Sequence, residues 1–170
     1  MIILSIGSNL SSKYGDRFTN IDLAVSYLSS YGIKIIKKSS FYETPSYPDS
    51  SKPKFINLAI IIETRLPPVD LMSVLIFIEE KLERKRILKN DPRTCDIDII
   101  DYNGKLLNLK YEKLNLTIPH KNLNKRNFVL FPIQEINPSW KHPETQEDIN
   151  SLINKLPSDQ KNSILKINKN

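Results

Sequence analysis

The sequence predicts an α+β fold, in which helices pack on the faces of an antiparallel sheet. Two observations support this prediction: short apolar runs flanked by turn residues are typical of strands, and two longer segments repeat apolar residues at helical spacing. The chain has 170 residues, of which 39% are hydrophobic, so it is long enough to bury a core without disulfides. We expect one domain over residues 1–170, with the tail after residue 156 at its periphery.

The first half of the chain is expected to form a strand, a helix and two more strands. The apolar run over residues 1–5 predicts a strand that leads into a Gly-Ser-Asn turn. Apolar residues spaced by three and four positions predict a helix that begins near residues 16–19 and ends at Gly32. Residues 33–42 and 55–64 are predicted strands, and the proline-bearing loop between them is a candidate binding loop.

The second half adds a long helix, a strand and several shorter elements. Two prolines open a predicted helix over residues 67–85, whose apolar residues share one face. Residues 96–102 predict a strand, and Asn103-Gly104 predicts a hairpin turn after it. The remaining predicted elements are a return strand over 105–109, a helix over 123–136 interrupted at Pro132, and a short helix over 149–156. The order β, α, β, β, α, β is that of a ferredoxin-like sheet.

The composition restricts the class of protein and its compartment. No apolar run approaches the roughly 18 residues of a membrane-spanning helix, and residues 1–9 lack the pattern of a secretory signal. The single cysteine, Cys95, cannot form an internal disulfide, which agrees with a reducing compartment. The net charge of +6 permits a polyanionic partner without identifying one. We expect a cytoplasmic monomer.

Two aspartates on the predicted strand over residues 96–102 are the sharpest local signal. Alternate residues of a strand point to the same face, so Asp96 and Asp98 project together, about 6.6 Å apart along the backbone. Paired carboxylates repel each other unless a cation lies between them, and oxygen ligands in a partly hydrated site suit Mg²⁺. The alternative is a polar face in solvent, although aspartate is depleted in strands.

Basic residues gather directly before the carboxylate pair and again after it. Guanidinium groups bind phosphate oxygens bidentately, so basic residues beside a magnesium pair have the polarity that an ATP site needs. The alternative is a solvated helix end, which the residues alone favour for Lys81 and Lys85. The chain has 4 glycines and no G-x-x-x-x-G-K run, so no P-loop is predicted. The basic residues are Lys81, Arg84, Lys85, Arg86, Lys89 and Arg93 before the pair, and Lys121, Lys125 and Arg126 after it.

Three further candidates are ambiguous from the residues alone. Glu79 lies one position past the apolar face of its helix and is expected to be exposed, and a lone histidine such as His120 is more often structural. Phe55 and Asn57 are two apart on a strand, so a ring for stacking lies beside an amide that can donate and accept. Ordinary core packing is the more frequent explanation of such a pair.

Five motifs, taken together, resemble the 6-hydroxymethyl-7,8-dihydropterin pyrophosphokinase family of folate biosynthesis. The motifs are Ser5-Ile6-Gly7-Ser8-Asn9-Leu10, Ser40-Phe41-Tyr42-Glu43-Thr44-Pro45, Phe55-Ile56-Asn57, Pro92-Arg93-Thr94-Cys95-Asp96-Ile97-Asp98-Ile99 and Ile118-Pro119-His120. They occur in the order of the family and cover residues 1–135. The resemblance implies a ferredoxin-like core, two Mg²⁺ ions, ATP, and release of AMP after pyrophosphate reaches the pterin hydroxymethyl group. The pattern departs at Asn90 and Asp91, where the family usually carries tryptophan and glycine.

The resemblance also implies a role for individual residues. Asp96 and Asp98 would hold both metal ions, and Arg84, Arg86 and Arg93 would stabilise the charge on the phosphates. The positions on the ATP side are Glu79, Arg84, Arg86, Arg93, Ile99, Thr117, His120, Lys121 and Arg126. The positions on the pterin side are Thr44, Pro45, Tyr47, Phe55, Asn57, Asp96 and Phe128, with the two phenylalanines on opposite faces of the ring.

The favoured mechanism is in-line attack by the pterin hydroxymethyl oxygen on the β-phosphorus of ATP, with the loop over residues 84–91 excluding water. The partners are then small molecules, with no nucleic acid and no membrane. A different magnesium-dependent nucleotidyl or phosphoryl transferase could use the same carboxylate pair. A basic ferredoxin-like module that binds RNA is a second alternative, but it lacks an RNP-type aromatic run and leaves two aspartates on the binding face.

Overall fold

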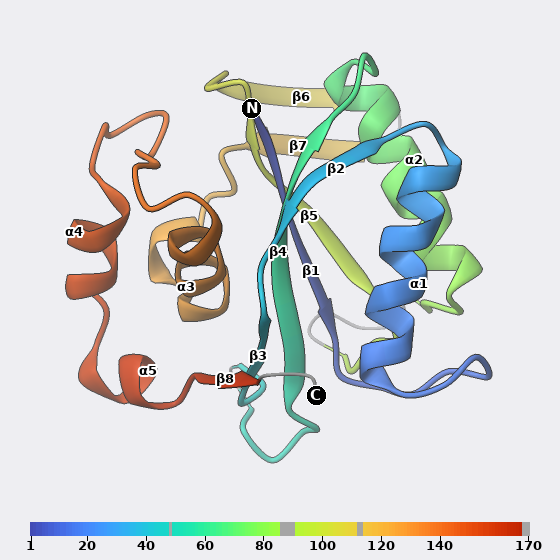
Figure 1. The fold of residues 1–170 in the computed structure, drawn as a ribbon, viewed down its shortest axis with the longest axis horizontal. Helices are drawn as coiled ribbons and strands as arrows, with labels where there is room; N and C mark the ends of the chain where they lie inside the picture. Colours follow the sequence, from blue (N-terminus) through green and yellow to red (C-terminus); the bar gives the residue numbers. More distant parts are fainter. Residues whose placement is uncertain (48, 86–90, 112–113, 168–170) are drawn as a thin grey trace.

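A six-stranded antiparallel sheet forms the centre of the computed structural model, which describes residues 1–47, 49–85, 91–111 and 114–167 (Figure 1). Its strand order is β5-β1-β4-β3-β8, and β2 also pairs with β4. The strands of this sheet are β1 (Ile2–Ser8), β2 (Lys34–Lys38), β3 (Phe41–Thr44), β4 (Phe55–Glu63), β5 (Asp96–Tyr102) and β8 (Leu165–Ile167).

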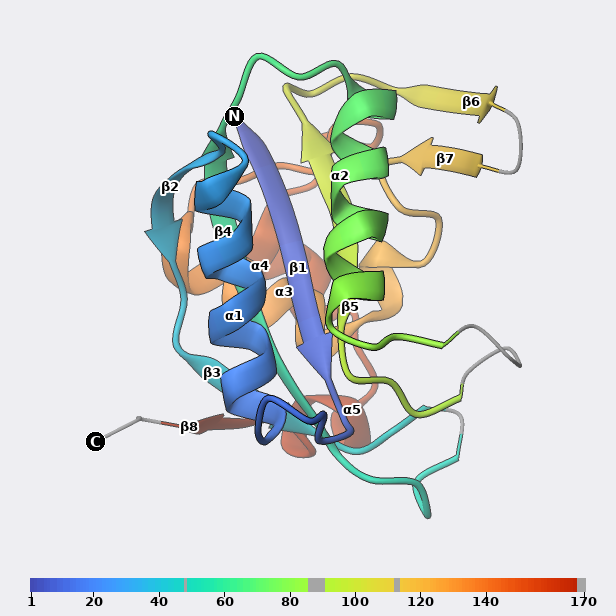
Figure 2. The same cartoon turned by 90° about the vertical axis from the view of Figure 1, so that its right-hand side faces the viewer.

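Helices cover both faces of this sheet (Figures 1 and 2). Helices α1 (Arg17–Ser30) and α2 (Pro68–Lys81) lie on one face, and α3 (Asn127–Ile136) lies on the other, with α4 (Ile149–Asn154) beside it. In chain order, β1, α1, the β2–β3 segment, β4, α2 and β5 form the βαββαβ unit, with β1 between β4 and β5. The prediction of a ferredoxin-like α+β fold is confirmed.

Two apolar clusters hold the layers together, one on each face of the sheet. Leu4 and Ile6 of β1 belong to the cluster under α1 and α2, whereas Ile3 belongs to the cluster under α3 and α4. Because side chains alternate along a strand and both faces are covered, the central strands are apolar at nearly every position. Asp96 and Asp98 at the start of β5 are therefore an exception among strands whose side chains are otherwise mostly apolar.

The segment over residues 33–42 forms two strands, so the prediction of one continuous strand is wrong. The break falls at Ser39, whose Oγ accepts a hydrogen bond from the backbone N of Ala59 at 3.0 Å. A side chain thus takes a place in the ladder that a backbone carbonyl would fill in a regular strand. The preceding strand, β2, also carries a register shift between Ile35 and Lys37, which bends it.

The turn after β5 forms, but the predicted return strand does not pair with β5. Asn103 and Gly104 have φ values of 55° and 69°, as a tight turn of the predicted kind requires. The backbone N of Asn103 donates to the Met1 carbonyl at 2.8 Å, and that of Gly104 donates to the Asp101 carboxylate at 2.8 Å. These bonds hold the turn against β1. The chain then leaves the sheet and forms a separate hairpin of β6 (Leu107–Tyr111) and β7 (Leu114–Ile118).

The predicted helix over residues 123–136 is interrupted at Arg126 and not at Pro132. A 3₁₀ turn, η1 (Leu123–Lys125), precedes α3, and Arg126 between them is extended, with φ −117° and ψ 100°. Pro132 lies inside α3, where it costs about 3 kcal/mol relative to alanine. Burial of the apolar side of α3 against the sheet offsets that cost.

The two remaining differences concern element ends. Helix α2 stops at Lys81 and not near residue 85, because Glu83 adopts a left-handed conformation with φ 66°. After residue 156 the chain forms α5 (Ser158–Asn162) and then β8, which pairs with the edge strand β3. The sequence did not indicate this last strand.

Candidate active site

Asp96 and Asp98 project from the same face of β5, as their spacing predicts. Their side chains are 23% and 32% exposed, whereas Ile97 and Ile99 between and after them are buried in the cluster under α1 and α2. The carboxylates therefore lie on the α3 side of the sheet, close to the N-terminal end of that helix. Arg126, directly before α3, reaches Asp98, with its Nη1 3.2 Å from Oδ2.

Three arginines neutralise the carboxylate pair. Arg84 Nη1 lies 2.6 Å from Asp96 Oδ1, and Arg93 Nη2 lies 2.9 Å from Asp96 Oδ2. Burial favours the neutral form of Asp96, but the charges of Arg93 and Arg84 outweigh it and lower its pKa. Burial and the neighbouring charge of Asp96 raise the pKa of Asp98. The surroundings therefore favour the ionised form of Asp96 and disfavour the ionised form of Asp98.

Glu79 is buried, so the expectation of an exposed glutamate is wrong. Its Oε1 accepts hydrogen bonds from Arg84 Nη1 at 2.5 Å and from the backbone N of Ile97 at 2.8 Å. The carboxylate thus joins α2 to β5 and orients Arg84 toward Asp96. A glutamate next to the apolar face of a helix gives no sequence signal of this role, because one partner, Arg84, lies just past the helix end and the other is the backbone of Ile97 on a separate strand.

A row across three strands places the predicted pterin residues beside the carboxylates. Gly7 of β1 pairs with Asn57 of β4 on one side and with Asp96 of β5 on the other. Directly opposed residues of antiparallel strands face the same way, and neighbouring strands lie about 4.8 Å apart. A Cβ atom on Gly7 would lie 2.9 Å from Asn57 Oδ1 and 3.5 Å from Phe55 Cδ1. The bare glycine therefore leaves room for both side chains at this point of the sheet.

The remaining pterin-side residues are placed around this row. Asn57 is buried, and its Nδ2 donates to Thr44 Oγ1 at 3.1 Å. Pro45 is half-buried, whereas Tyr47 is 80% exposed. Thr44 therefore lies beside Asn57, whereas the Tyr47 side chain lies in solvent, and the roles of both residues toward a pterin stay predictions.

The two predicted stacking rings each lie beside an arginine. The Arg93 guanidinium carbon is 5.2 Å from the centre of the Phe55 ring, and that of Arg126 is 5.5 Å from the centre of the Phe128 ring. In the part of the chain that the structure describes, no ring contact joins these two phenylalanines. Each of these two rings therefore has a guanidinium group close to it.

Three predicted ATP-side residues line a cavity of about 440 Å³ at the β6–β7 hairpin. Thr117, His120 and Lys121 form one side of this cavity, and the loop that contains His142 and Glu144 forms another. The sequence did not indicate this second loop. Burial lowers the pKa of His120, and the nearby charge of Asp98 opposes that shift.

Two predicted ATP-side residues remain apart from these groups. Ile99 is buried between the sheet and the α1–α2 layer and does not line the cavity beside His120. Arg86, with most of the loop over residues 84–91, lies outside the described residues. Its predicted role on the phosphates stays a prediction.

The donor set of the carboxylate pair fits Mg²⁺ bound together with a nucleotide. Among the described residues, no group of three or more histidine, cysteine, aspartate or glutamate side chains could hold a metal ion. Mg²⁺ needs fewer protein ligands than that, because it keeps several waters and binds through one or two carboxylates plus substrate phosphates. Asp96 and Asp98 provide two such carboxylates, partly open to solvent.

Comparison with known proteins identifies the family. The family model described as 7,8-dihydro-6-hydroxymethylpterin-pyrophosphokinase (HPPK) matches residues 3–138, and this range contains all the candidate site residues. The chain belongs to the HPPK family. A 2-amino-4-hydroxy-6-hydroxymethyldihydropteridine pyrophosphokinase of Synechocystis is 33% identical over 155 residues, which cover 91% of this chain and 75% of that protein. A protein of the same name from Bacillus subtilis is 36% identical over 134 residues, which cover 78% and 75%.

Other relatives carry HPPK as part of a longer protein. The folic acid synthesis protein fol1 of Schizosaccharomyces pombe is 36% identical over 156 residues, and the chain spans only 20% of its length. A crystal structure of wild-type HPPK-DHPS from Plasmodium falciparum with pteroate superposes with a TM-score of 0.73 at 17% identity, covering 91% of this chain and 44% of that one. That likeness supports the HPPK fold. Within the described ranges, no helix is long and apolar enough to cross a membrane.

Proposed function

We propose that this HPPK chain transfers pyrophosphate from ATP to the hydroxymethyl group of 6-hydroxymethyl-7,8-dihydropterin and releases AMP, as a step of folate biosynthesis. The observation that carries the proposal is the row from Asn57 through Gly7 to Asp96. Along this row, Asn57 lies about 10 Å from Asp96, with the Phe55 ring beside it. An amide and an aromatic ring that could bind a heterocycle are thus close to a carboxylate pair that could bind Mg²⁺ together with phosphate groups.

Asp96 and Asp98 would hold two Mg²⁺ ions, which neutralise and orient the triphosphate when bound. Arg84 and Arg93 already meet Asp96, so a metal on this carboxylate would free both guanidinium groups to bind phosphate oxygens. Arg86 would act with them. Glu79 keeps the Arg84 guanidinium in place through this exchange, because its own bond to Arg84 does not involve Asp96.

The pterin would lie against Phe55, with Phe128 on its other face and Asn57 at its polar edge. Asn57 Nδ2 donates a hydrogen bond to Thr44 Oγ1, so the amide group is fixed in one orientation before a ligand binds. The hydroxymethyl oxygen then attacks the β-phosphorus of ATP in line, and the bond from that phosphorus to the α,β-bridging oxygen breaks. AMP leaves, and the pterin keeps both transferred phosphoryl groups.

Thr117, His120, Lys121 and Arg126 would complete the nucleotide side, and because the Ile99 side chain is buried under α1 and α2, any contact of Ile99 with the adenine would come from its backbone. The cavity of about 440 Å³ beside His120 is roomy enough for part of a nucleotide. With its pKa lowered by burial, His120 would be neutral at pH 7 until phosphate charge approaches it.

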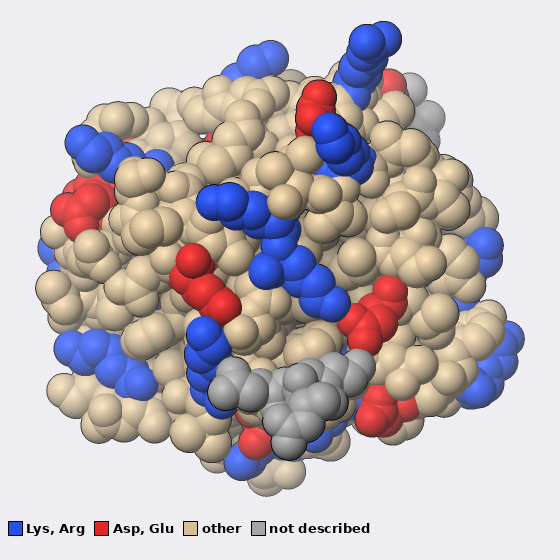
Figure 3. Space-filling model, in the orientation of Figure 1, with Lys and Arg blue, Asp and Glu red and all other residues tan. Residues whose placement is uncertain are grey.

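The partners would be these small molecules, with no nucleic acid and no membrane, and the protein would act as a cytoplasmic monomer of one domain over residues 1–170. The RNA-binding alternative needs a continuous basic surface. On the face shown in Figure 3, lysines and arginines are interspersed with aspartates and glutamates. Aspartates and glutamates border the central run of basic side chains on this side, so a phosphate track there would be short.

The metal assignment is tested by truncating each carboxylate. Asp96→Ala and Asp98→Ala should each reduce kcat/KM by about 10³-fold or more, because each leaves a metal under-ligated. Asp101→Asn is the matched control: Asp101 lies on the same strand and is buried, but its carboxylate binds Trp140 Nε1 at 2.9 Å, away from the pair. If Asp96→Ala or Asp98→Ala kept near-normal turnover at saturating magnesium, the assignment would be wrong.

A further inference from the structure

Asn9, which directly follows β1, uses its whole side-chain amide to join two separate segments of the site. Its Nδ2 donates to Ser46 Oγ at 3.2 Å and to the Pro53 carbonyl at 3.1 Å. Its Oδ1 accepts from the backbone N of Arg93 at 2.6 Å. The backbone adds a second link, since the N of Asn9 donates to the Arg93 carbonyl at 3.0 Å. The residue is 2% exposed.

The two segments belong to opposite halves of the proposed site. Arg93 contacts Asp96 with its guanidinium group and lies over the Phe55 ring, on the phosphate side. Ser46 and Pro53 lie on the loop over residues 45–53, which carries the proposed pterin contacts at Pro45 and Tyr47. One buried side chain thus sets the distance between a phosphate-binding arginine and the pterin loop.

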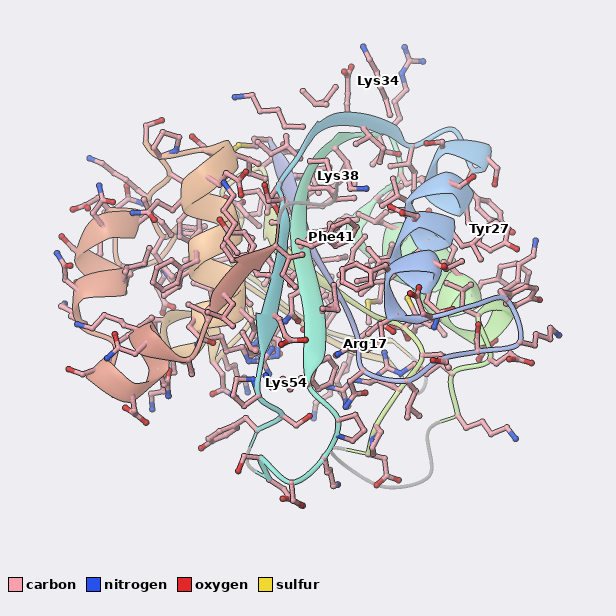
Figure 4. The ribbon with its side chains drawn as sticks, turned by 60° about the horizontal axis from the view of Figure 1, so that its bottom comes forward. Arg17, Tyr27, Lys34, Lys38, Phe41 and Lys54 are labelled. Atoms are coloured by element: carbon pink, nitrogen blue, oxygen red, sulfur yellow. The ribbon has the colours of Figure 1, made fainter. Side chains whose placement is uncertain are left out.

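Two ion pairs at the base of this loop are more exposed than the Asn9 contacts and therefore weaker. Arg17 and Lys54, which are labelled in Figure 4, both pair with Glu43, at 3.5 Å and 3.0 Å. Lys54 is 55% exposed in this pair, and exposed ion pairs contribute little because solvent screens them. Ser46 Oγ also donates to the Pro53 carbonyl at 2.6 Å, so Asn9, Ser46 and Pro53 form a closed, partly buried network.

The chemistry of the position requires an amide. Two donors and one acceptor must act at once from a single short side chain, and asparagine supplies all three. An aspartate would keep the acceptor for the Arg93 N–H and lose both donors to the loop. Alanine would remove all three bonds and leave the backbone N–H of Arg93 without its side-chain acceptor, while Ser46 Oγ and the Pro53 carbonyl would keep only their bond to each other.

We propose that Asn9 is a positioning residue that holds Arg93 in register with the pterin loop over residues 45–53. The inference rests on the proposed pyrophosphate transfer. Each half of the site keeps its own side chains without Asn9, so each substrate can still bind. The reacting oxygen and the β-phosphorus must approach to about 3–3.5 Å in line, and a shift of about 1 Å between the halves can cost about 100-fold in rate.

The test separates kcat from binding in three variants. Asn9→Asp removes both donors to the loop, Ser46→Ala removes one of the two contacts and leaves the bond from Asn9 Nδ2 to the Pro53 carbonyl, and Asn20→Ala is the matched control. Asn20 is fully buried in the neighbouring segment, where its side chain binds Leu10 O at 2.9 Å and Ser12 Oγ at 2.6 Å and contacts neither Arg93 nor the loop. We expect Asn9→Asp and Ser46→Ala to lower kcat by about 10- to 100-fold while changing the Kd of each substrate by less than about threefold.

Asn20→Ala should lower the melting temperature and leave kcat of the folded fraction unchanged. The inference is overturned if Asn9→Asp and Ser46→Ala keep wild-type kcat, or if Asn20→Ala loses as much kcat as they do. It is also overturned if the Asn9 and Ser46 variants lose both substrates in proportion to their unfolded fraction. Ser46→Ala keeps the test decisive if the Asn9 variant does not fold. A wild-type protein without pterin-dependent AMP formation would instead refute the proposed function.

Discussion

Truncating Asp96 should destabilise the protein without metal or nucleotide, whereas truncating Asp98 should hardly change its stability. Asp96 makes two close ion pairs, at 2.6 Å with Arg84 and 2.9 Å with Arg93, and its pKa is lowered. Among the described residues, Asp98 makes one longer pair, at 3.2 Å with Arg126, and its pKa is raised by burial and by the charge of Asp96. The two carboxylates therefore contribute unequally to the free energy of unfolding as long as no cation is bound to them.

The structure sets the size of this difference. Removing one partner of a fully buried ion pair costs about 3–5 kcal/mol. Asp96 is 23% exposed, and Arg84 keeps its bond to Glu79 when Asp96 is removed, so the cost should be smaller than for a fully buried pair. We therefore expect Asp96→Ala to lower the free energy of unfolding by about 2–3 kcal/mol. That corresponds to a fall of about 4–12 °C in melting temperature for a domain of this size. For Asp98→Ala the lost pair and the relieved repulsion nearly cancel, and the change should stay within about 1 kcal/mol.

The assay is urea denaturation of wild type and both variants in EDTA, at pH 7 and over an acid series. Because the folded pKa of Asp96 is lowered, its stabilisation is present above the unfolded value of 3.8 and is lost as the pH falls through the folded pKa. Because the folded pKa of Asp98 is raised, its ionisation costs stability as the pH rises above 3.8, and Asp98→Ala should remove that cost. Equal destabilisation by the two variants would refute the reasoning.

Three other perturbations probe the surroundings of the pair. Glu79→Ala should lower the free energy of unfolding, measured by urea denaturation, by about 3–5 kcal/mol, because it leaves the charge of Arg84 partly uncompensated in a buried site. A decrease under about 1 kcal/mol would contradict this expectation. Gly7→Ala should raise the pterin KM about tenfold or more and leave the ATP KM unchanged, since the new Cβ would lie 2.9 Å from Asn57 Oδ1; equal effects on both would argue against the row. Phe128→Ala should weaken pterin binding by about 1–3 kcal/mol in calorimetry with an unreactive ATP analogue, and a lower melting temperature without that loss would assign the ring to the core.

The sequence predicts the parts of this site that depend on local periodicity. A strand alternates its side chains with a period of two, so Asp96 and Asp98 had to share a face, and Phe55 and Asn57 likewise. The helix over Arg17–Ser30 begins at Asp16, whose carboxylate accepts from Thr19 N at 2.9 Å, as a capping residue in that position predicts. Such features need only the residues within one turn or one strand.

The parts that the sequence does not predict depend on contacts between distant segments. The burial of Glu79 requires Arg84 and the Ile97 backbone to meet it, and the pairing of β8 with β3 requires the chain to return after α5. The side-chain hydrogen bonds of Asn9 join it to residues that lie 37, 44 and 84 positions away in the sequence. None of these has a period or a local signal, so only the folded structure displays them.

The measurement that tests the central claim most directly is the nucleotide product formed from ATP and Mg²⁺ with and without 6-hydroxymethyl-7,8-dihydropterin. Separation of the products by ion-exchange chromatography resolves AMP from ADP and detects the modified pterin. We predict that AMP and a pterin diphosphate form in equal amounts, and that AMP does not form when the pterin is left out. ADP as the product, or AMP that forms at the same rate without the pterin, would contradict pyrophosphate transfer to this substrate.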